Sequence, residues 1–482
     1  MRLSKSRLLS HLQCPKRLWL DVHRPEVGRY SARAQLRFET GHRVGEVARE
    51  LYAQGREVAF DRDISIALSD SQGELFPAES PLAKVFFEAP FRHQDILIRA
   101  DVLERSSSGT RLIEVKSAGR VKDEHLPDVA IQSWVISGSG VRLSDAAIAH
   151  VDMRFRYEGN GDYRGLLVEQ PVASLVAPLV PRVATWASDA QRTLAGPEPR
   201  IRVGRHCHSP HECPFIGYCW PRTDYPLTVL PRSDKQLDEW IAKGYRDVRD
   251  IPEAEVAGET RLRIWRATLA GRAETGPGLR EALRAIPFPR YYLDFETIDF
   301  AVPIWAGTHP RQAIPFQWSI HVETEPGVIE HLEFLDVTGE FPVVALAQRL
   351  IAALGSSGAI VSYSSYEYGC IERLAALVPS LALPLQALLP RIVDLLPLFR
   401  REYYHPAMQG SWSLKALLPA VVPGLRYERL GEVTDGESAQ RAYLEATDPS
   451  TSMLRKAQIV RSLLDYCRFD THAMVLLVGA FR

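Results

Sequence analysis

The chain has 482 residues, of which 46% are hydrophobic and 24% are charged, and its formal net charge at pH 7 is -1. These values predict a soluble globular protein of two or three domains. Six cysteines in so long a chain exclude a disulfide-stapled secreted scaffold, and the apolar stretches are interrupted before they reach a membrane-spanning length of about 18 residues. We therefore expect no membrane association and a reducing, cytoplasmic environment.

The first 50 residues carry an excess of positive charge, with eleven Lys and Arg residues against five Asp and Glu residues. Such a segment suits a surface that follows nucleic-acid phosphates, although a solvated helix face is the commoner explanation of a charge run. The segment also contains Cys14, in the stretch LQCPKRLWL.

Residues 96–120, ILIRADVLERSSSGTRLIEVKSAGR, are expected to form two strands joined by a Ser/Gly turn. Glu114 and Lys116 are two residues apart on the second strand, so they share one face, and Asp101 ends the partner strand. This arrangement resembles the PD-(D/E)XK nucleases, in which two carboxylates hold Mg²⁺ and the lysine serves the attacking water. A lone Glu-x-Lys is also a common exposed alternation.

Further positions carry the resemblance to the RecB-like branch of these nucleases. Glu88, in KVFFEAPF, matches an additional acidic position, and Gln132, in DVAIQSWVI, matches the glutamine of the Gln-x-x-x-Tyr element. Ile136 stands in place of that tyrosine, which puts its contact with nucleic acid in doubt. His42 matches a histidine that ligates metal in some relatives, and a surface or capping role explains it equally well.

Three cysteines, Cys207, Cys213 and Cys219, follow with five residues between neighbours. An early Cys-Pro, at Cys14, followed much later by three clustered cysteines resembles the RecB-like iron-sulfur nucleases, including AddB and the CRISPR adaptation nucleases. The resemblance implies that these four residues bind a [4Fe-4S] cluster. Zinc remains the main alternative, although structural zinc ligands are usually two to four residues apart, and buried structural cysteines are a third.

Proline and glycine density marks two boundaries, at residues 221–234 and 275–290. We expect a nuclease-like domain over residues 1–225, a helical connector over 226–285 and a second domain over 286–482.

The second domain opens with YYLDFETIDF, which places Asp294 and Glu296 on one face of a strand. Near its end, SLLDYCRFDTHAMVLL is expected to be helical, with Tyr466 and Asp470 four residues apart on one face. These motifs resemble the DEDD exonucleases of the tyrosine subtype, on an RNase H-like fold. In that family carboxylates hold two metal ions and the tyrosine orients the water.

The middle motif of that family is the weakest match. In AIVSYSSYEYGCIERL the chain has Tyr366 and Glu367 where the exonucleases have Phe-Asp, and a glutamate reaches one methylene further. Asp394, in RIVDLLPLF, is another carboxylate that the motif order brings near the site.

Taken over nearly its full length, the chain resembles a bacterial family of uncharacterised proteins that joins a RecB-like iron-sulfur nuclease domain to an RNase H-like domain. The resemblance implies a mixed α/β protein and a nuclease with two catalytic centres that uses Mg²⁺ or Mn²⁺ and cleaves DNA, with RNA as an alternative at the second centre. A cluster-stabilised nucleic-acid-binding or redox-sensing protein with inactive sites remains the other hypothesis.

Overall fold

A computed structural model describes residues 3–30, 32–52, 55–58, 84–107, 109–220, 223–425, 427 and 430–482. The protein is mixed α/β and divides into two compact units. The first comprises Met1–Trp220 and Phe300–Gln312, and the second comprises Pro221–Asp299 and Ala313–Arg482. The segment expected to be a separate connector therefore belongs to the second unit, while a short segment from the expected second domain belongs to the first.

The first unit is built on a mixed sheet in which β1 pairs with β4 and the other described strands follow the order β2-β3-β4-β5-β6-β7. Its strands are β1 (Leu3–Ser4), β2 (Arg56–Glu57), β3 (Lys84–His93), β4 (Ile96–Ser106), β5 (Gly109–Lys116), β6 (Leu143–Val151) and β7 (Leu167–Pro171). The pairs β3/β4 and β4/β5 are antiparallel, and β5/β6 is parallel. Alternation along β5 sends Leu112 into one core and Ile113 into another.

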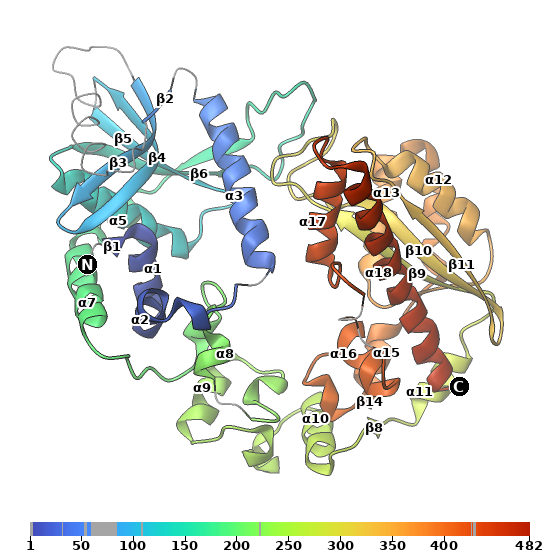
Figure 1. Ribbon diagram of the computed structural model, residues 1–482. Coiled ribbons are helices and arrows are strands. Elements are labelled where there is room, and N and C mark those ends of the chain that lie inside the picture. Colours follow the sequence, from blue (N-terminus) through green and yellow to red (C-terminus); the bar gives the residue numbers. More distant parts are fainter. Residues whose placement is uncertain are drawn as a thin grey trace. The chain divides into compact units, whose positions relative to one another are not determined.

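The first unit also contains helices, some of which pack on this sheet (Figure 1). They are α1 (Lys5–Gln13), α2 (Pro15–His23), α3 (Ala32–Leu51), α5 (Leu126–Gly138), α6 (Ala173–Val176), α7 (Val183–Ala195) and α8 (Ile216–Cys219). Helix α5 packs on β3, β4 and β6, and α1 packs on α5 and α7. Ser4 caps α1, accepting a hydrogen bond from the Arg7 amide at 3.3 Å.

The second unit contains a mixed sheet with the order β11-β10-β9-β12-β13 and a small pair, β14-β8. Its strands are β8 (Glu274–Thr275), β9 (Arg290–Ile298), β10 (Ile314–Glu325), β11 (Val328–Leu335), β12 (Ala359–Ser362), β13 (Ile392–Asp394) and β14 (Tyr403–Tyr404). Strand β9 is antiparallel to β10 and parallel to β12. Its side chains are buried along most of its length, as expected for a central strand.

The helices of the second unit include one that is much longer than the rest, α18, which lies along the sheet (Figure 1). They are α9 (Asp234–Ala242), α10 (Glu259–Ala270), α11 (Gly278–Arg284), α12 (Val343–Leu354), α13 (Tyr366–Leu377), α14 (Ala382–Gln386), α15 (Leu395–Glu402), α16 (Leu414–Val421), α17 (Gly436–Thr447) and α18 (Met453–Ala480). Helices α13, α17 and α18 all pack on β9, which carries the first motif of this unit.

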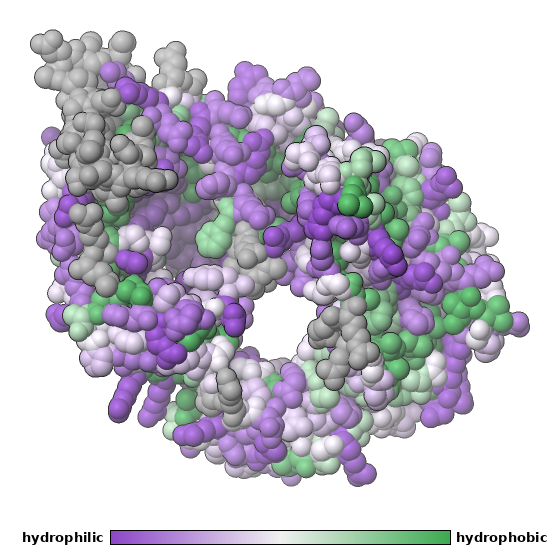
Figure 2. Space-filling view, viewed as in Figure 1, coloured by the Kyte–Doolittle hydropathy of each residue, from purple (hydrophilic) through white to green (hydrophobic). Residues whose placement is uncertain are grey.

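No single helix in the described ranges combines the length and apolar character needed to cross a bilayer; one bent pair, Tyr366–Leu377 with Pro379–Arg391, meets the criterion by length and composition only. On the face seen in Figure 2, hydrophilic residues predominate and apolar residues form scattered patches.

Candidate functional site

Six polar residues of the first unit meet where α1 and α5 pack near strands β4 and β5, and we call them the first cluster. They are Lys5 from α1, Asp101 from β4, Glu114 and Lys116 from β5, and Asp128 and Gln132 from α5. The structure brings together four residues that the motifs selected, and it adds Lys5 and Asp128.

Glu114 is the centre of the hydrogen-bond network in the first cluster. Lys116 Nζ donates to Glu114 Oε1 and to Asp128 Oδ2, at 2.6 Å each. The amide of Gln132 donates to Glu114 Oε2 at 2.5 Å. Lys5 Nζ lies 3.1 Å from Glu114 Oε1 and 3.0 Å from Asp128 Oδ1. Both oxygens of Glu114 are therefore engaged by donors, two of which are ammonium groups.

The charges of the first cluster are only partly balanced. Burial raises the pKa of Glu114 to about 7, and repulsion from Asp101 and Asp128 adds to the rise. Burial also raises the pKa of Asp101. Burial would raise the pKa of Asp128 as well, but attraction to Lys5 and Lys116 outweighs it and holds that pKa well below its usual range. The two lysines thus keep one carboxylate ionised.

Asp101 is held by the backbone rather than by a lysine. Asp101 lies within β4 and not at its end as expected, and its Oδ2 accepts a hydrogen bond from the amide of Val115 at 2.9 Å, which ties the middle of β4 to β5. A carboxylate anchored through one oxygen retains the lone pairs of the other for a cation.

Other residues predicted around this centre lie elsewhere. Glu88, on β3, has a positive φ of 54°, and its carboxylate pairs with Arg99 at 3.1 Å. His42 is exposed on α3. Ile136 is buried in the core of the first unit. Within the described residues, neither Glu88 nor His42 joins the hydrogen-bond network of the first cluster.

The second unit gathers four acids where α13 and α18 pack on β9, and we call them the second cluster. They are Asp294 and Glu296 from β9, Glu367 from α13 and Asp470 from α18. All four were selected by the sequence motifs. Glu296, Glu367 and Asp470 are at most 8% exposed.

Two tyrosines and a lysine border the second cluster. The Tyr427 hydroxyl donates a short hydrogen bond to Asp470, and the rings of Tyr427 and Tyr466 lie 6.2 Å apart. Lys415 Nζ lies 5.4 Å from the centre of each ring, but it donates to the carbonyl of Thr434 at 2.6 Å. In the described part of the chain, no basic side chain forms an ion pair with any acid of the second cluster.

The pKa values of the four acids in the second cluster reflect the lack of an ion-pair partner among the described residues. Burial, with mutual repulsion, raises the pKa of Asp294 and of Glu296 well above their usual range. Burial raises the pKa of Glu367 to about 7 and that of Asp470 to about 6. Four carboxylates so placed can all ionise only with added positive charge, which a divalent cation provides.

Asp394 has a structural contact at the edge of this region. Its side chain caps α15 by accepting a hydrogen bond from the Leu396 amide at 2.9 Å. Burial raises its pKa, and its charge contributes to the raised pKa of Glu367.

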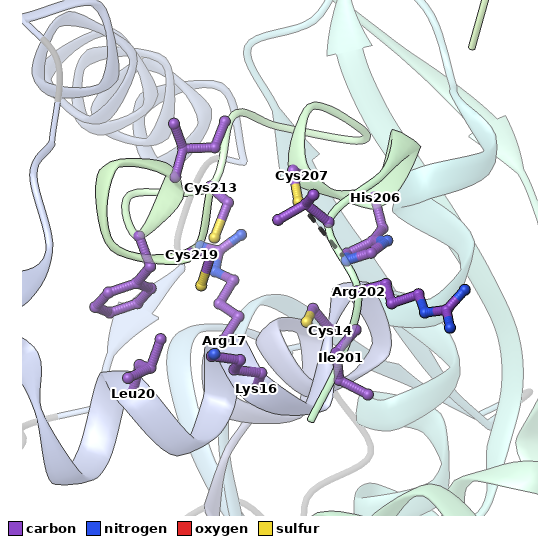
Figure 3. A pocket seen from close by; sticks show the side chains of 13 residues that line it. Cys14, Lys16, Arg17, Leu20, Ile201, Arg202, His206, Cys207, Cys213 and Cys219 are labelled. Carbon is purple, nitrogen blue, oxygen red and sulfur yellow. Dashed lines mark hydrogen bonds between the residues drawn. The ribbon is translucent and has the colours of Figure 1, made fainter. Parts of the chain in front are cut away.

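The four cysteines selected from the sequence line one pocket in the first unit, shown in Figure 3. Cys14 lies between α1 and α2, and the other three lie in the segment that ends with α8. Gln13 Nε2 donates to the carbonyls of His206 and His211 at 2.7 Å each, which fastens the end of α1 to the cysteine-bearing segment. Residues far apart in the chain are thus joined beside the pocket.

Basic side chains share the pocket with the thiols. In a tetrahedral zinc site with Zn–S bonds of about 2.3 Å, the sulfur atoms lie about 3.8 Å apart. Among the described residues, no three of these thiols lie within 4.8 Å of one another. Lys16 and Arg17 also line the pocket, where they would offset the charge of thiolates.

Burial favours the protonated form of three thiols in this pocket, Cys207, Cys213 and Cys219. Burial raises the pKa of Cys207 and Cys219, and raises that of Cys213 to about 11. Binding a metal or cluster therefore requires release of protons from these side chains.

Sequence reasoning missed several residues of these sites. Asp128 lies four positions before Gln132, a helical spacing that could have identified it. Lys5 and Tyr427 reach their partners across 109 and 43 residues, respectively, so no local pattern marks them. Cys467 was read only as part of a helix, although its neighbours Tyr466 and Asp470 were selected.

Comparison with known proteins gives limited information about this chain. The solved structure titled "Crystal structure of SSO0001" is 13% identical, with a TM-score of 0.18; the match covers 41% of this chain and 78% of that chain. Such a low score carries no argument. No curated protein matches the chain. Residues 291–413 match the family described as "Domain of unknown function (DUF2779)", and these residues include Asp294, Glu296 and Glu367.

Proposed function

We propose that the chain is a metal-dependent nuclease with two catalytic centres, which hydrolyses phosphodiester bonds in DNA, with RNA as an alternative at the second centre. The proposal assigns a RecB-like PD-(D/E)XK domain to the first unit and an RNase H-like DEDD exonuclease domain to the second. One observation carries it: four acids from three motifs far apart in the sequence converge in the second cluster with no basic partner among the described residues.

At the second centre, the chain would supply ligands and orient water. Two metal ions would activate the water and stabilise the leaving oxygen. Asp294, Glu296, Glu367 and Asp470 would hold them. Tyr466, packed beside Tyr427, would orient the nucleophilic water by its hydroxyl, and its raised pKa keeps that hydroxyl protonated.

At the first centre, Asp101 and Glu114 would hold Mg²⁺ or Mn²⁺, and Lys116 would position the water. Gln132 supports Glu114 through its hydrogen bond, so it acts as a positioning residue. Oε1 of Glu114 accepts from Lys5 and Lys116 and Oε2 accepts from Gln132, so the second lone pair of Oε2 is the position left for a cation. Glu88, engaged with Arg99, would assist only after leaving that ion pair.

Cys14, Cys207, Cys213 and Cys219 would bind a [4Fe-4S] cluster with a structural role. The support is the shared pocket, the spacing of the thiols and the three Lys and Arg residues that line it. The cluster would join the beginning of the first unit to its end.

The test is a cleavage assay on protein purified without oxygen. End-labelled single-stranded DNA, double-stranded DNA and RNA are incubated with Mg²⁺ or Mn²⁺, and EDTA serves as the control. We expect metal-dependent cleavage of at least one DNA substrate. Intact substrates under all these conditions, with protein that is folded and carries its cluster, would favour the non-catalytic binding hypothesis.

A further inference from the structure

A thiol lies inside the second cluster. Cys467, on α18, has its Sγ 3.4 Å from Asp294 Oδ2 and 3.7 Å from the Asp294 carbonyl oxygen. Ligand atoms of Cys467, Asp294 and Glu296 all lie within 4.8 Å of one another. The side chain of Cys467 is completely buried. The geometry therefore places a sulfur among the oxygens that would hold a cation.

Glu296 gives an independent sign that a ligand is missing. It is only 7% exposed, and its carboxylate has no hydrogen bond or ion pair within the described ranges. Lys415, whose charge favours the ionised form, donates its hydrogen bond to Thr434 instead. A buried carboxylate is normally paired or bound to metal. Glu296 points toward Asp294 and Cys467, so the missing partner belongs between these three side chains.

We propose that Cys467 is a ligand of the cation held by Asp294 and Glu296, so that the second centre selects borderline or soft divalent cations such as Zn²⁺ and Co²⁺ over Mg²⁺. This inference rests on the proposed function of the second unit and names the class of metal used there. Thiolate favours soft and borderline metals, whereas Mg²⁺ is bound through oxygen.

Binding changes the chemical state of the thiol. The S–H bond of Cys467 breaks, a sulfur–metal bond forms, and the proton passes to solvent, with no change of oxidation state. In the metal-free protein the same proton lies between sulfur and Asp294, where the thiol donates to the carboxylate. The cation takes the place of that proton.

Cys370 is a matched control for Cys467. It is also a completely buried thiol of the second unit, on α13. Its sulfur accepts a hydrogen bond from Arg373 at 3.2 Å, and it is not part of the ligand group. Replacing either cysteine by serine removes one buried sulfur, but only one of the two changes would remove a metal ligand.

The experiment is an anaerobic titration of the full chain, with its cysteine pocket filled as purified, using Co²⁺ as the probe. Wild type, Cys467→Ser, Cys370→Ser and Asp294→Asn are compared by near-ultraviolet absorption, where sulfur-to-cobalt charge transfer is seen, and by calorimetry with Zn²⁺. All variants share the four-cysteine pocket, so differences between them report on the second cluster. Cys467→Ala provides a second variant if the serine form does not fold.

We expect charge-transfer absorption at the second cluster in wild type and Cys370→Ser and its loss in Cys467→Ser. Zn²⁺ affinity should fall at least about 10-fold in Cys467→Ser, since even loss of an outer contact to a metal ligand costs that much. Cobalt binding that depends on Asp294 but gives the same spectrum with and without Cys467 would overturn the inference and leave the proposed function standing. Absence of any Asp294-dependent cation binding would overturn both.

Discussion

The two carboxylate clusters differ in how their negative charge is balanced. In the first cluster, Lys5 and Lys116 reach Glu114 and Asp128 at 2.6–3.1 Å and supply positive charge from the chain itself. In the second cluster, none of the described basic side chains forms an ion pair with an acid, and burial drives the pKa of every carboxyl upward. The chain itself supplies cations to the first cluster, whereas in the second cluster the carboxyls are held toward their neutral forms.

This difference separates positions that matter for stability from positions that matter for activity. Removing Glu114 or Asp128 from the first cluster leaves Lys5 and Lys116 to share one remaining carboxylate partner, which is costly. Removing an acid from the second cluster relieves repulsion and, under the proposed function, would remove a metal ligand at the same time. Catalytic sites are commonly places where stability is sacrificed for function.

The largest effect is expected for Asp294→Asn, which removes a ligand from the second cluster. Activity of the second centre should fall by more than the range of about 10²–10⁴-fold that general acid–base help supplies, because metal binding is lost. The measurement is the cleavage rate in a Lys116→Ala background, where the first centre is silent. An unchanged rate would show that Asp294 does not hold a catalytic metal.

Loss of Cys14, the proposed cluster ligand from the beginning of the chain, should destabilise the first unit alone. Protein prepared without oxygen should be brown, and Cys14→Ser should lose the colour. A cross-link that closes the chain between Cys14 and Cys207 stabilises by about 5 kcal/mol in the chain-entropy relation used for disulfides. Unfolding followed by calorimetry should show a lower transition for the first unit only. One zinc per chain and no iron would rule out the iron-sulfur assignment.

Asp128→Asn should lower the free energy of unfolding of the first unit by about 3 kcal/mol, at the lower end of the range for breaking a buried ion pair. The lower end applies because the side chains of Lys5 and Lys116 are 21% and 22% exposed and can turn toward water. Asp294→Asn is the control in the second cluster. In the absence of metal, this variant should leave the free energy of unfolding unchanged or raise it. An equal loss of unfolding free energy in Asp128→Asn and Asp294→Asn would contradict the proposed difference in charge balance between the two clusters.

The smallest effect concerns pH. Folded Glu367 and Asp470, with pKa values of about 7 and about 6, hold protons that the unfolded chain has released above about pH 4.5. The folded state then binds more protons, so stability of the metal-free protein should decrease as pH rises from about 4.5 to about 7.

Glu114 has a pKa of about 7, so it also makes the stability of the first unit decrease as pH rises. A variant is therefore needed to assign the decrease to the second cluster. Glu367→Gln should make the free energy of unfolding less dependent on pH. Denaturant titrations at several pH values measure this dependence. Saturation with a divalent cation should flatten it as well, because the cation replaces the protons. A slope unaffected by the variant and by the cation would contradict the raised pKa values.

Local geometry explains which features could be predicted from the sequence. Strand alternation placed Glu114 beside Lys116 and Asp294 beside Glu296, because residues two apart share a face whatever the rest of the fold does. Helical spacing likewise placed Tyr466 and Asp470 together. The mixed α/β class, by contrast, was implied by the family resemblance that these motifs carry.

Long-range contacts explain what could not be predicted. Lys5 joins the first cluster because α1 packs on α5, and nothing within its own segment indicates that contact. Residues 300–312 follow β9 directly, yet Ala301 and Val302 pack in a core with Tyr157 and Leu166 of the first unit. Such partners depend on tertiary packing, which composition and periodicity do not encode.

The most direct test of the central claim, two separate metal-dependent centres, compares wild type, Lys116→Ala, Asp294→Ala and the double variant on end-labelled single-stranded DNA, double-stranded DNA and RNA. The reactions contain Mg²⁺, Mn²⁺ or Zn²⁺, and the protein is prepared without oxygen. We predict that each single variant keeps the activity of the other centre and that only the double variant is inactive. Loss of all cleavage in Lys116→Ala alone would contradict an autonomous second centre, and full cleavage by the double variant would contradict both.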